Sequence, residues 1–272
     1  MSNVTQRVLT GLVGAAVVVA ICWLGGWAFG ALIAVLAVAA QFELYGLLRA
    51  GGTRPLIGLG LVMGAVAALW PILAGSGLML AGGLLALLPT VLYLRRTTPL
   101  MDAAGTAFGV LYPCLLASSL VLLRTSESMG LTDSDRFWLT IAVLFAVWSA
   151  DSFAYFAGRA FGRTPLFERI SPNKTWEGAA GGALGAFAMA AAFKWAVLGG
   201  ALGWVDAVVI AVASGVLGPF GDLAESLFKR SVGVKDSATW LPGHGGLLDR
   251  VDAMIVAAPV IVLYFHMTRG LL

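Results

Sequence analysis

The chain is 272 residues long, 60% hydrophobic and only 11% charged, whereas an average soluble domain is about 25% charged. Its mean hydropathy is +0.92, and its 35 glycines suit the close packing of helices in lipid. This composition excludes a soluble enzyme, a disordered chain and a fibrous protein. It predicts an all-α, polytopic membrane protein. The net charge of +3 is explained by basic cytoplasmic loops, so we expect no nucleic-acid partner.

The charged residues are so unevenly spaced that they outline the membrane spans. None occurs between Arg7 and Glu43 or between Arg54 and Arg95. A helix needs about 20 apolar residues to cross the bilayer, so each of these gaps holds two spans. The apolar run after Arg7 leads directly into a second one, which favours an uncleaved first helix over a signal peptide. We expect about nine transmembrane helices, at 8–24, 28–48, 56–73, 78–94, 105–123, 137–157, 178–198, 207–227 and 251–269.

The basic residues predict the orientation of these spans. With the N-terminus in the cytoplasm, thirteen Lys and Arg residues fall on the cytoplasmic side, as the positive-inside rule requires. The four on the opposite side are Arg124, Arg136, Lys194 and Arg269. The two polar loops, 158–177 and 228–250, then both face the cytoplasm, where we expect the chemistry.

We expect two functional regions. Residues 1–136 carry five spans and no motif, and are expected to form a scaffold and dimer region, whereas 137–272 form the catalytic region. Glu43 is the first acidic residue of the chain and stands at the end of the second expected span. We interpret it as an interfacial carboxylate rather than a catalytic group. Cys22 and Cys114 lie in apolar runs and are expected to be buried thiols.

The sixth expected helix carries a carboxylate where charge is costly. Asp151 follows fourteen uncharged residues, and a carboxylate at the bilayer centre costs about 2.5–3.5 kcal/mol on insertion scales. Tyr155 and Arg159 lie one and two helical turns further on, so the three side chains can share a face. This pattern favours a functional role for Asp151 and Tyr155 over a helix end that simply reaches the interface.

The segment 171–178, Ser-Pro-Asn-Lys-Thr-Trp-Glu-Gly, comes directly before the seventh expected span. Asn173 or Thr175 can cap that helix, and its N-terminal N–H groups suit a phosphate. An ordinary cap beside an interfacial Lys-Trp pair is the alternative. The glycines that follow have a GxxxG-like spacing, which indicates helix packing rather than ligand binding. The substrate-binding residues expected here are Ser171, Lys174, Thr175 and Glu177.

Residues 222–252 are the densest run of polar residues in the chain. Asp222, Ser226 and Lys229 are spaced i, i+4, i+7 and therefore share one helix face. Asp222 follows fifteen uncharged residues, and a divalent cation would compensate its burial. Asp222 and Asp249 could hold Mg²⁺, which takes one or two carboxylates together with substrate phosphate oxygens. The positive charge for a nucleoside triphosphate would come from Lys229, Arg230, Lys235 and Arg250.

Each of these features also has an ordinary explanation. Acidic residues at a helix start stabilise the helix dipole, and basic residues bind anionic lipid head groups. A lone histidine such as His244 is usually a loop residue. The glycines of 242–246, however, allow the backbone to approach a ligand closely. The density of polar groups in so apolar a chain favours an active site.

Two motifs in this stretch resemble the phosphatidate cytidylyltransferases, also called CDP-diacylglycerol synthases. The segments 171–178 and 151–155 are similar to that family as well. The likeness covers roughly residues 148–252, whereas 1–140 resemble the family only in being apolar. The motifs are Ser226-x2-Lys229-Arg230-x4-Lys235-Asp236 and Leu241-Pro242-x-His244-Gly245-Gly246-x2-Asp249-Arg250-x-Asp252.

The resemblance implies that CTP and phosphatidic acid give CDP-diacylglycerol and pyrophosphate, a step of phospholipid biosynthesis. It implies Mg²⁺ as cofactor, often assisted by K⁺, and a membrane-integral homodimer. The expected metal ligands are Asp222, Asp249 and Asp252. The expected catalytic residues are Lys229, Arg230, Lys235, Asp236, His244 and Arg250. The expected substrate-binding residues outside 171–178 are Asp151, Tyr155, Ser226, Gly245 and Gly246.

Three other functions are compatible with parts of this pattern. A related CTP-dependent transferase or kinase would act on a prenol-type lipid. A secondary transporter would use Asp151 and Asp222 to carry protons or ions. A non-catalytic lipid-binding scaffold would leave the buried Asp222 unexplained. A compact chain without a transit peptide suggests the bacterial inner membrane, with the active site facing the cytoplasm.

Overall fold

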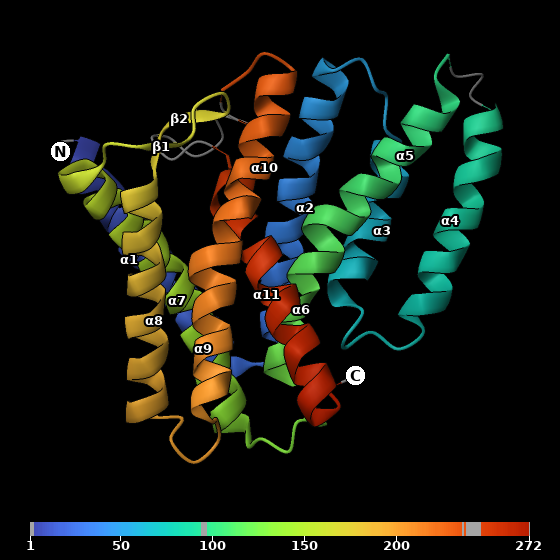
Figure 1. Cartoon of the computed structure of the whole chain (residues 1–272). Coiled ribbons are helices and arrows are strands. Elements are labelled where there is room, and N and C mark those ends of the chain that lie inside the picture. Colours follow the sequence, from blue (N-terminus) through green and yellow to red (C-terminus); the bar gives the residue numbers. More distant parts are fainter. Residues whose placement is uncertain (1–2, 94–96, 236, 238–245, 272) are drawn as a thin grey trace. The chain divides into compact units, whose positions relative to one another are not determined.

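The computed structural model describes residues 3–93, 97–235, 237 and 246–271. Over these residues the chain is mostly helical and forms nine helical rods (Figure 1). Two of the rods each contain a short π-helical turn that does not interrupt the helix. The rods are α1 (Asn3–Leu24), α2 (Gly26–Ala50), α3 (Ile57–Leu69), α4 (Ser76–Tyr93), α5–η1–α6 (Pro99–Gly109, Val110–Leu115, Leu116–Thr125), α7 (Asp133–Phe161), α8 (Trp176–Ala196), α9–η2–α10 (Trp204–Val212, Ala213–Leu217, Gly218–Ser231) and α11 (Leu248–Arg269).

Each rod lies where the apolar runs predict a helix. Six of them are long and apolar enough to cross a bilayer, so the chain is a polytopic membrane protein. Gly11–Leu24 and Ile57–Leu69 add two shorter apolar stretches. The expected total of nine spans and the cytoplasmic N-terminus stay predictions. The six candidate spans are Gly26–Ala50, Ser76–Tyr93, Pro99–Thr125, Asp133–Phe161, Trp204–Ser231 and Leu248–Arg269.

Both π-helical turns are close to a proline. Pro113 lies inside η1, and Pro219 follows η2 by two residues. Proline has no N–H to donate, and its ring clashes with the carbonyl four residues earlier. Widening one turn of the helix relieves this conflict without breaking the rod. The two spans therefore stay continuous, as expected from the sequence.

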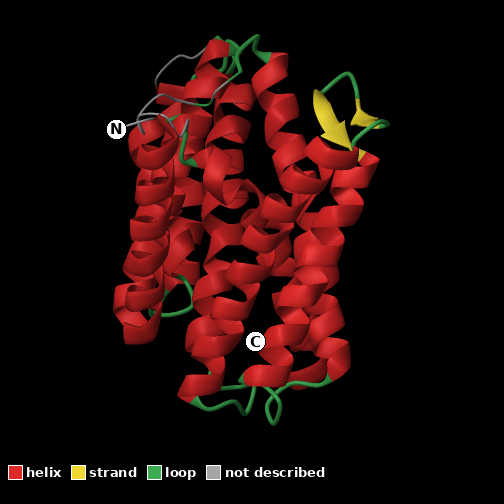
Figure 2. Cartoon of the chain, turned by 90° about the vertical axis from the view of Figure 1, so that its left-hand side faces the viewer, coloured by secondary structure: helices red, strands yellow, loops and turns green. Residues whose placement is uncertain are grey.

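The connection between α7 and α8 is a small antiparallel hairpin (yellow in Figure 2). β1 (Pro165–Phe167) pairs with β2 (Ser171–Thr175), with Pro165 opposite Thr175 and Phe167 opposite Ser171. The chain is therefore mostly helical rather than all-α. A local reason is Pro172, because a residue that precedes proline, here Ser171, is driven towards extended backbone.

The contacts divide the chain into two compact units, each described here by itself. The first unit is Met1–Val121 with Phe228–Val251, and the second is Leu122–Leu227 with Asp252–Leu272. The boundaries fall inside α6, α10 and α11. This division differs from the expected functional one at residue 136, which stays a prediction.

A buried polar cluster joins three helices of the first unit. Gln41 of α2 donates hydrogen bonds to the Tyr45 hydroxyl and to the Gly60 carbonyl of α3, both at 2.8 Å. The Tyr45 hydroxyl donates to the carbonyl of Thr106 in α5, also at 2.8 Å. Each polar group thus has a partner, as apolar surroundings require. Cys114 is a buried free thiol in this unit, and so is Cys22, as expected.

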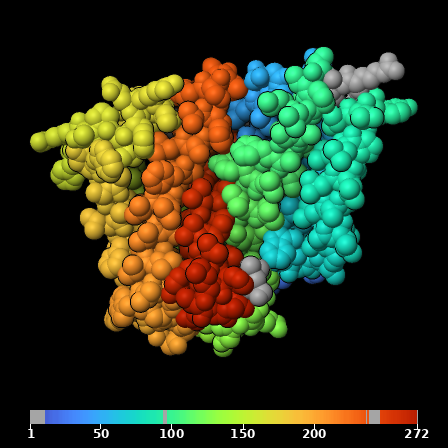
Figure 3. Space-filling model, turned by 45° about the vertical axis from the view of Figure 1, so that its right-hand side comes forward, coloured from blue at the N-terminus to red at the C-terminus, as the bar shows by residue number. Residues whose placement is uncertain are grey.

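The outer face of α4 in this unit is strongly apolar and exposed (teal in Figure 3). Leu78 and Leu92 have 82% and 83% of their surface exposed. Such a face is unfavourable in water but ordinary against lipid chains. It is consistent with α4 as a membrane span.

In the second unit, α8 packs closely on α7 through glycines. A Cβ atom on Gly178 would lie 3.0 Å from the Ala154 carbonyl oxygen, and one on Gly182 would lie 2.9 Å from that of Ala150. Gly215 of η2 also faces α8 so closely that an added Cβ atom would overlap that helix. The predicted packing role of the glycines after residue 177 is confirmed.

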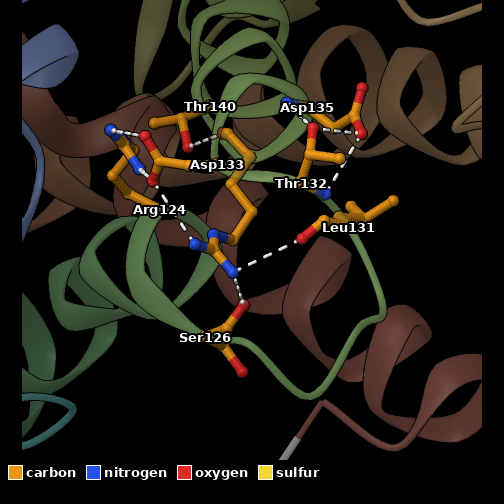
Figure 4. A network of polar contacts seen from close by, with 8 residues as sticks. Arg124, Ser126, Leu131, Thr132, Asp133, Asp135 and Thr140 are labelled. Carbon is orange, nitrogen blue, oxygen red and sulfur yellow. Dashed lines mark hydrogen bonds and ion pairs between the residues drawn. The ribbon is translucent and has the colours of Figure 1, made fainter.

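An ion-pair network fixes the start of α7 at the end of α6 (Figure 4). Arg124 binds both carboxylate oxygens of Asp133, at 2.6 and 3.2 Å. Arg136 approaches the same carboxylate at 3.3 Å, and Thr132 with Asp135 forms a capping box. Two of the four basic residues expected outside the cytoplasm belong to this network, and a third, Arg269, pairs with Asp206 at 2.6 Å.

Candidate active site

In the second unit, a loop lysine and an expected metal ligand form an ion pair. Lys174 stands in β2, just before α8, and its ammonium group pairs with Asp222 of α10. The two side chains are 27% and 40% exposed. The Ser226 hydroxyl, one turn further along α10, donates to Asp222 at 3.4 Å. The structure thus brings together three of the expected site residues.

Further carboxylates surround this pair within the same unit. Asp252 is 7% exposed, and Glu225, one turn of α10 after Asp222, is fully buried. Asp222 and Asp151 lie close enough to interact electrostatically with Asp252. Carboxylates gathered in an apolar bundle need cationic partners, because burial and mutual repulsion both disfavour their charged forms. The sequence analysis assigned a role to the three aspartates but none to Glu225.

The residues at the start of α8 have clear structural roles. The Thr175 hydroxyl accepts a hydrogen bond from the Gly178 N–H at 3.1 Å and caps the helix. The Glu177 carboxylate accepts from the N–H groups of Arg163 at 3.1 Å and Thr164 at 3.3 Å, and so closes the turn after α7. Its own N–H and that of Arg163 lower the pKa of Glu177 to about 2. The expected substrate contacts of Thr175 and Glu177 stay predictions.

Tyr155 and Arg159 share the exposed face of α7, as their spacing predicts. The guanidinium of Arg159 donates to the Tyr155 hydroxyl at 3.1 Å. Tyr155 is 59% exposed, and Asp151 is also exposed. Ser171 is partly buried in β2.

In the first unit, a second lysine–aspartate pair stands at the start of α11. Lys229 of α10 pairs with Asp249, and the two side chains are only 12% and 17% exposed. Asp249 also accepts from the Gly246 N–H at 2.9 Å and from the Ser237 hydroxyl at 3.3 Å. Two of the three aspartates expected to bind metal, Asp222 and Asp249, are therefore each paired with a lysine.

The remaining expected residues are divided between exposed and undescribed positions. Arg230, Lys235 and Arg250 are exposed, and Arg230 reaches the Val234 carbonyl at 3.4 Å. Asp222, Ser226 and Lys229 all lie in α10, so their helical spacing is confirmed. Asp236, His244 and Gly245 lie outside the described residues.

Glu43 has partners that the sequence analysis did not predict. It is 5% exposed, and its oxygens accept from the N–H groups of Leu247 at 2.8 Å and Leu248 at 2.9 Å. The Ser237 hydroxyl donates to it at 2.9 Å. Glu43 is therefore not a free side chain at a helix end, whereas its place at the membrane interface stays a prediction. The available signal was the one used for Asp151, a carboxylate after a long uncharged run.

The donor chemistry of these residues fits a magnesium ion. Among the described residues, no three His, Cys, Asp or Glu side chains are grouped closely enough to hold a metal ion. Mg²⁺ does not need such a group, since it binds through one or two carboxylates and completes its shell with water and substrate phosphates. Asp222, Asp249 and Asp252 supply oxygen ligands of the required kind.

Comparison with known proteins identifies the family of the chain. A model of the cytidylyltransferase family matches residues 5–268. The chain belongs to the cytidylyltransferase family. The match extends through the first half, where the sequence analysis found no motif, and so includes Glu43 as well as the two lysine–aspartate pairs.

Named relatives support this membership. The phosphatidate cytidylyltransferase of Brucella abortus is 38% identical over 97% of the chain and 94% of the relative. That of Synechocystis is 31% identical over 96% of both. A chloroplastic phosphatidate cytidylyltransferase of Arabidopsis thaliana is 34% identical over 93% of the chain and 70% of the relative. The chain is therefore an enzyme of the cytidylyltransferase class.

Proposed function

We propose that the chain acts as a phosphatidate cytidylyltransferase, which converts CTP and phosphatidic acid to CDP-diacylglycerol and pyrophosphate. The observation that carries this proposal is the pairing of Lys174 with Asp222 and of Lys229 with Asp249. Each pair joins a lysine, whose ammonium group can bind phosphate, to an aspartate, whose oxygens can bind a metal ion. Both substrates of this reaction carry phosphates that such groups recognise.

The chemistry places modest demands on the protein. A phosphate oxygen of phosphatidic acid attacks the α-phosphorus of CTP, the bond from that phosphorus to the bridging oxygen breaks, and pyrophosphate leaves. A phosphate monoester has a second pKa near 6, so the nucleophile is already largely ionised at neutral pH. No strong general base is needed, and catalysis depends on positioning and charge neutralisation.

The lysines and arginines would perform that neutralisation. The phosphates of bound CTP would compete with the aspartates for the ammonium groups of Lys174 and Lys229. Arg230, Lys235 and Arg250 are exposed and can reach a ligand from water. Asp236, His244 and the glycines 245 and 246 are proposed to complete this loop around the substrates.

Asp222, Asp249 and Asp252 would supply ligands for Mg²⁺, and K⁺ would be the second cation. When bound, the metal ion supplies positive charge at the α-phosphate and at the departing pyrophosphate. Asp222 and Asp249 would supply carboxylate oxygens to the ion, whereas their partners Lys174 and Lys229 would bind phosphate groups of the substrates.

The architecture suits the two substrates. We place the N-terminus and both polar loops in the cytoplasm of a bacterial inner membrane, with 1–136 forming a homodimer contact. Soluble CTP would enter from water, whereas the two-tailed phosphatidic acid would arrive sideways from the bilayer. Asp151, Tyr155, Ser171 and Ser226 are proposed to line the approach of the substrates.

Product formation by the detergent-purified protein tests this proposal. Given phosphatidic acid, CTP, Mg²⁺ and K⁺, the protein is expected to release pyrophosphate and form CDP-diacylglycerol, and EDTA should abolish both. Undecaprenyl phosphate and dolichol replace phosphatidic acid in parallel reactions. Absence of CDP-diacylglycerol from a folded preparation, or turnover with a prenol-type acceptor alone, would refute the proposed substrate.

A further inference from the structure

The N-terminus of α11 is closed by a side chain from a distant helix. Leu247 and Leu248 follow Glu43 by 204 and 205 positions, and their N–H groups bind one oxygen each of its carboxylate. A helix N-terminus has unpaired N–H groups and a partial positive charge, which favour an anion. Glu43 therefore performs for α11 the capping role that a local side chain usually performs.

The same carboxylate is linked to Asp249 through one hydroxyl group. Ser237 Oγ lies 2.9 Å from Glu43 and 3.3 Å from Asp249. A serine hydroxyl has a single proton, so it can donate to only one of the two carboxylates at a time. The orientation of Asp249 is thereby connected to the position of Glu43, within a single compact unit of the chain.

Gly246 shows how little space this arrangement leaves. A Cβ atom on Gly246 would lie 2.5 Å from a carboxylate oxygen of Glu43 and would also overlap the Ser237 hydroxyl. The N–H of Gly246 donates to Asp249 at 2.9 Å. Glu43, Ser237 and Gly246 thus form one packed group. Asp249, the partner of Lys229, contacts this group through the Ser237 hydroxyl and the Gly246 N–H.

We propose that Glu43 is a positioning residue for the reaction, which holds Asp249 in the orientation needed to bind the metal ion. The inference rests on the proposed function, because that function makes Asp249 a metal ligand. Glu43 itself touches neither substrate nor metal. Its negative charge is satisfied by backbone N–H groups and a hydroxyl, so that Lys229 remains the partner of Asp249.

Glu43→Gln is the variant that tests this role. Glutamine has nearly the same size, but its NH₂ group cannot accept a hydrogen bond from a backbone N–H or a hydroxyl. Loss of a group that orients a metal ligand typically lowers metal affinity about 10- to 100-fold. We expect the Mg²⁺ concentration for half-maximal turnover to rise about tenfold, with KM for phosphatidic acid unchanged.

A second measurement is independent of turnover. Mg²⁺ that binds the folded protein raises its Tm, so the Mg²⁺ concentration giving half of that rise is measured in detergent without substrates. It should increase about tenfold in Glu43→Gln. Ser237→Ala keeps both backbone contacts of Glu43 and should move both midpoints in the same direction by a smaller factor. This thermal comparison separates the two proposals, because it stands even if phosphatidic acid is not the acceptor.

The matched controls are Glu127→Gln and Ser128→Ala, in the exposed loop before α7. Both are expected to retain the wild-type Mg²⁺ midpoints. A Glu43→Gln protein with lower turnover but unchanged midpoints in both measurements would show that Glu43 only stabilises the fold. If Glu43→Gln does not fold, Ser237→Ala decides by the same criterion, and unchanged midpoints in that variant would overturn the inference.

Discussion

At the scale of single residues, each of the two compact units contains one lysine–aspartate pair. Lys174 meets Asp222 and Lys229 meets Asp249 in a chain with only 11% charged residues. Lys229 and Asp249 are only 12% and 17% exposed, and removing one partner from a largely buried pair leaves an uncompensated charge, which destabilises more than the pair itself stabilises. The conservative change is therefore to an isosteric neutral side chain rather than to alanine.

Asp222→Asn and Asp249→Asn are each expected to reduce turnover to the level of the EDTA control. An amide oxygen is a much poorer Mg²⁺ ligand than a carboxylate because it carries no net charge. Turnover is measured as CDP-diacylglycerol formed, and folding as an unchanged elution profile in detergent. Retained activity in either folded variant would remove that aspartate as a metal ligand. Lys194→Ala, whose side chain donates to the Gly199 carbonyl and faces Trp204, should remain active.

The packing of α8 on α7 is the decisive contact at the scale of elements. The hairpin β1–β2 and the Lys174 side chain both depend on where α8 begins, and α8 can lie this close to α7 only because glycines face it. An added methyl group would have to displace backbone rather than a flexible side chain. Such overpacking commonly costs about 1–3 kcal/mol.

Gly182→Ala is accordingly expected to lower the thermal stability of the protein. Its new methyl group would lie 2.9 Å from the Ala150 carbonyl oxygen, and we expect a destabilisation of about 1–3 kcal/mol. The measurement is Tm in detergent, followed by tryptophan fluorescence. Gly82→Ala in α4 is the matched control, because nothing lies within 4 Å of the added atom. It should be neutral or slightly stabilising, and an equal loss in both variants would contradict the packing argument.

The orientation of the chain in the membrane is a property of the whole molecule. The loop before α7 and the hairpin after it flank one candidate span, Asp133–Phe161, so they lie on opposite sides of the bilayer if α7 crosses it. The excess of basic residues after α7 places the hairpin inside. Cys22 and Cys114 are buried, so a thiol reagent should react little with the unmodified protein.

Glu168→Cys in the hairpin and Glu127→Cys before α7 test this orientation. Both positions are exposed. A membrane-impermeant maleimide is expected to label Cys at 168 only in inside-out vesicles and Cys at 127 only in right-side-out spheroplasts. Labelling is read as a mass shift of the purified protein. The reverse pattern would place the N-terminus and the active site outside the cytoplasm, contrary to our proposal.

The sequence by itself determined the helical rods and the two motifs. A span depends on a local property, the length of an apolar run, and a motif is local by definition. Even the π-helical turns in two rods left the predicted helices continuous. The role predicted for Asp222 has a local basis as well, because its charge is costly after fifteen uncharged residues.

Only the tertiary structure decided which side chains meet. Nothing in the spacing of Lys174 indicates Asp222 as its partner, and nothing near Glu43 indicates Leu247 and Leu248, more than 200 residues later. The hairpin was missed for a related reason, since its strands are too short to show a period of their own. Apolar runs fix where helices are but not which helices are neighbours, because many pairings bury similar apolar surface. The partners of the charged groups are set by those neighbours, and so they appear only in the folded chain.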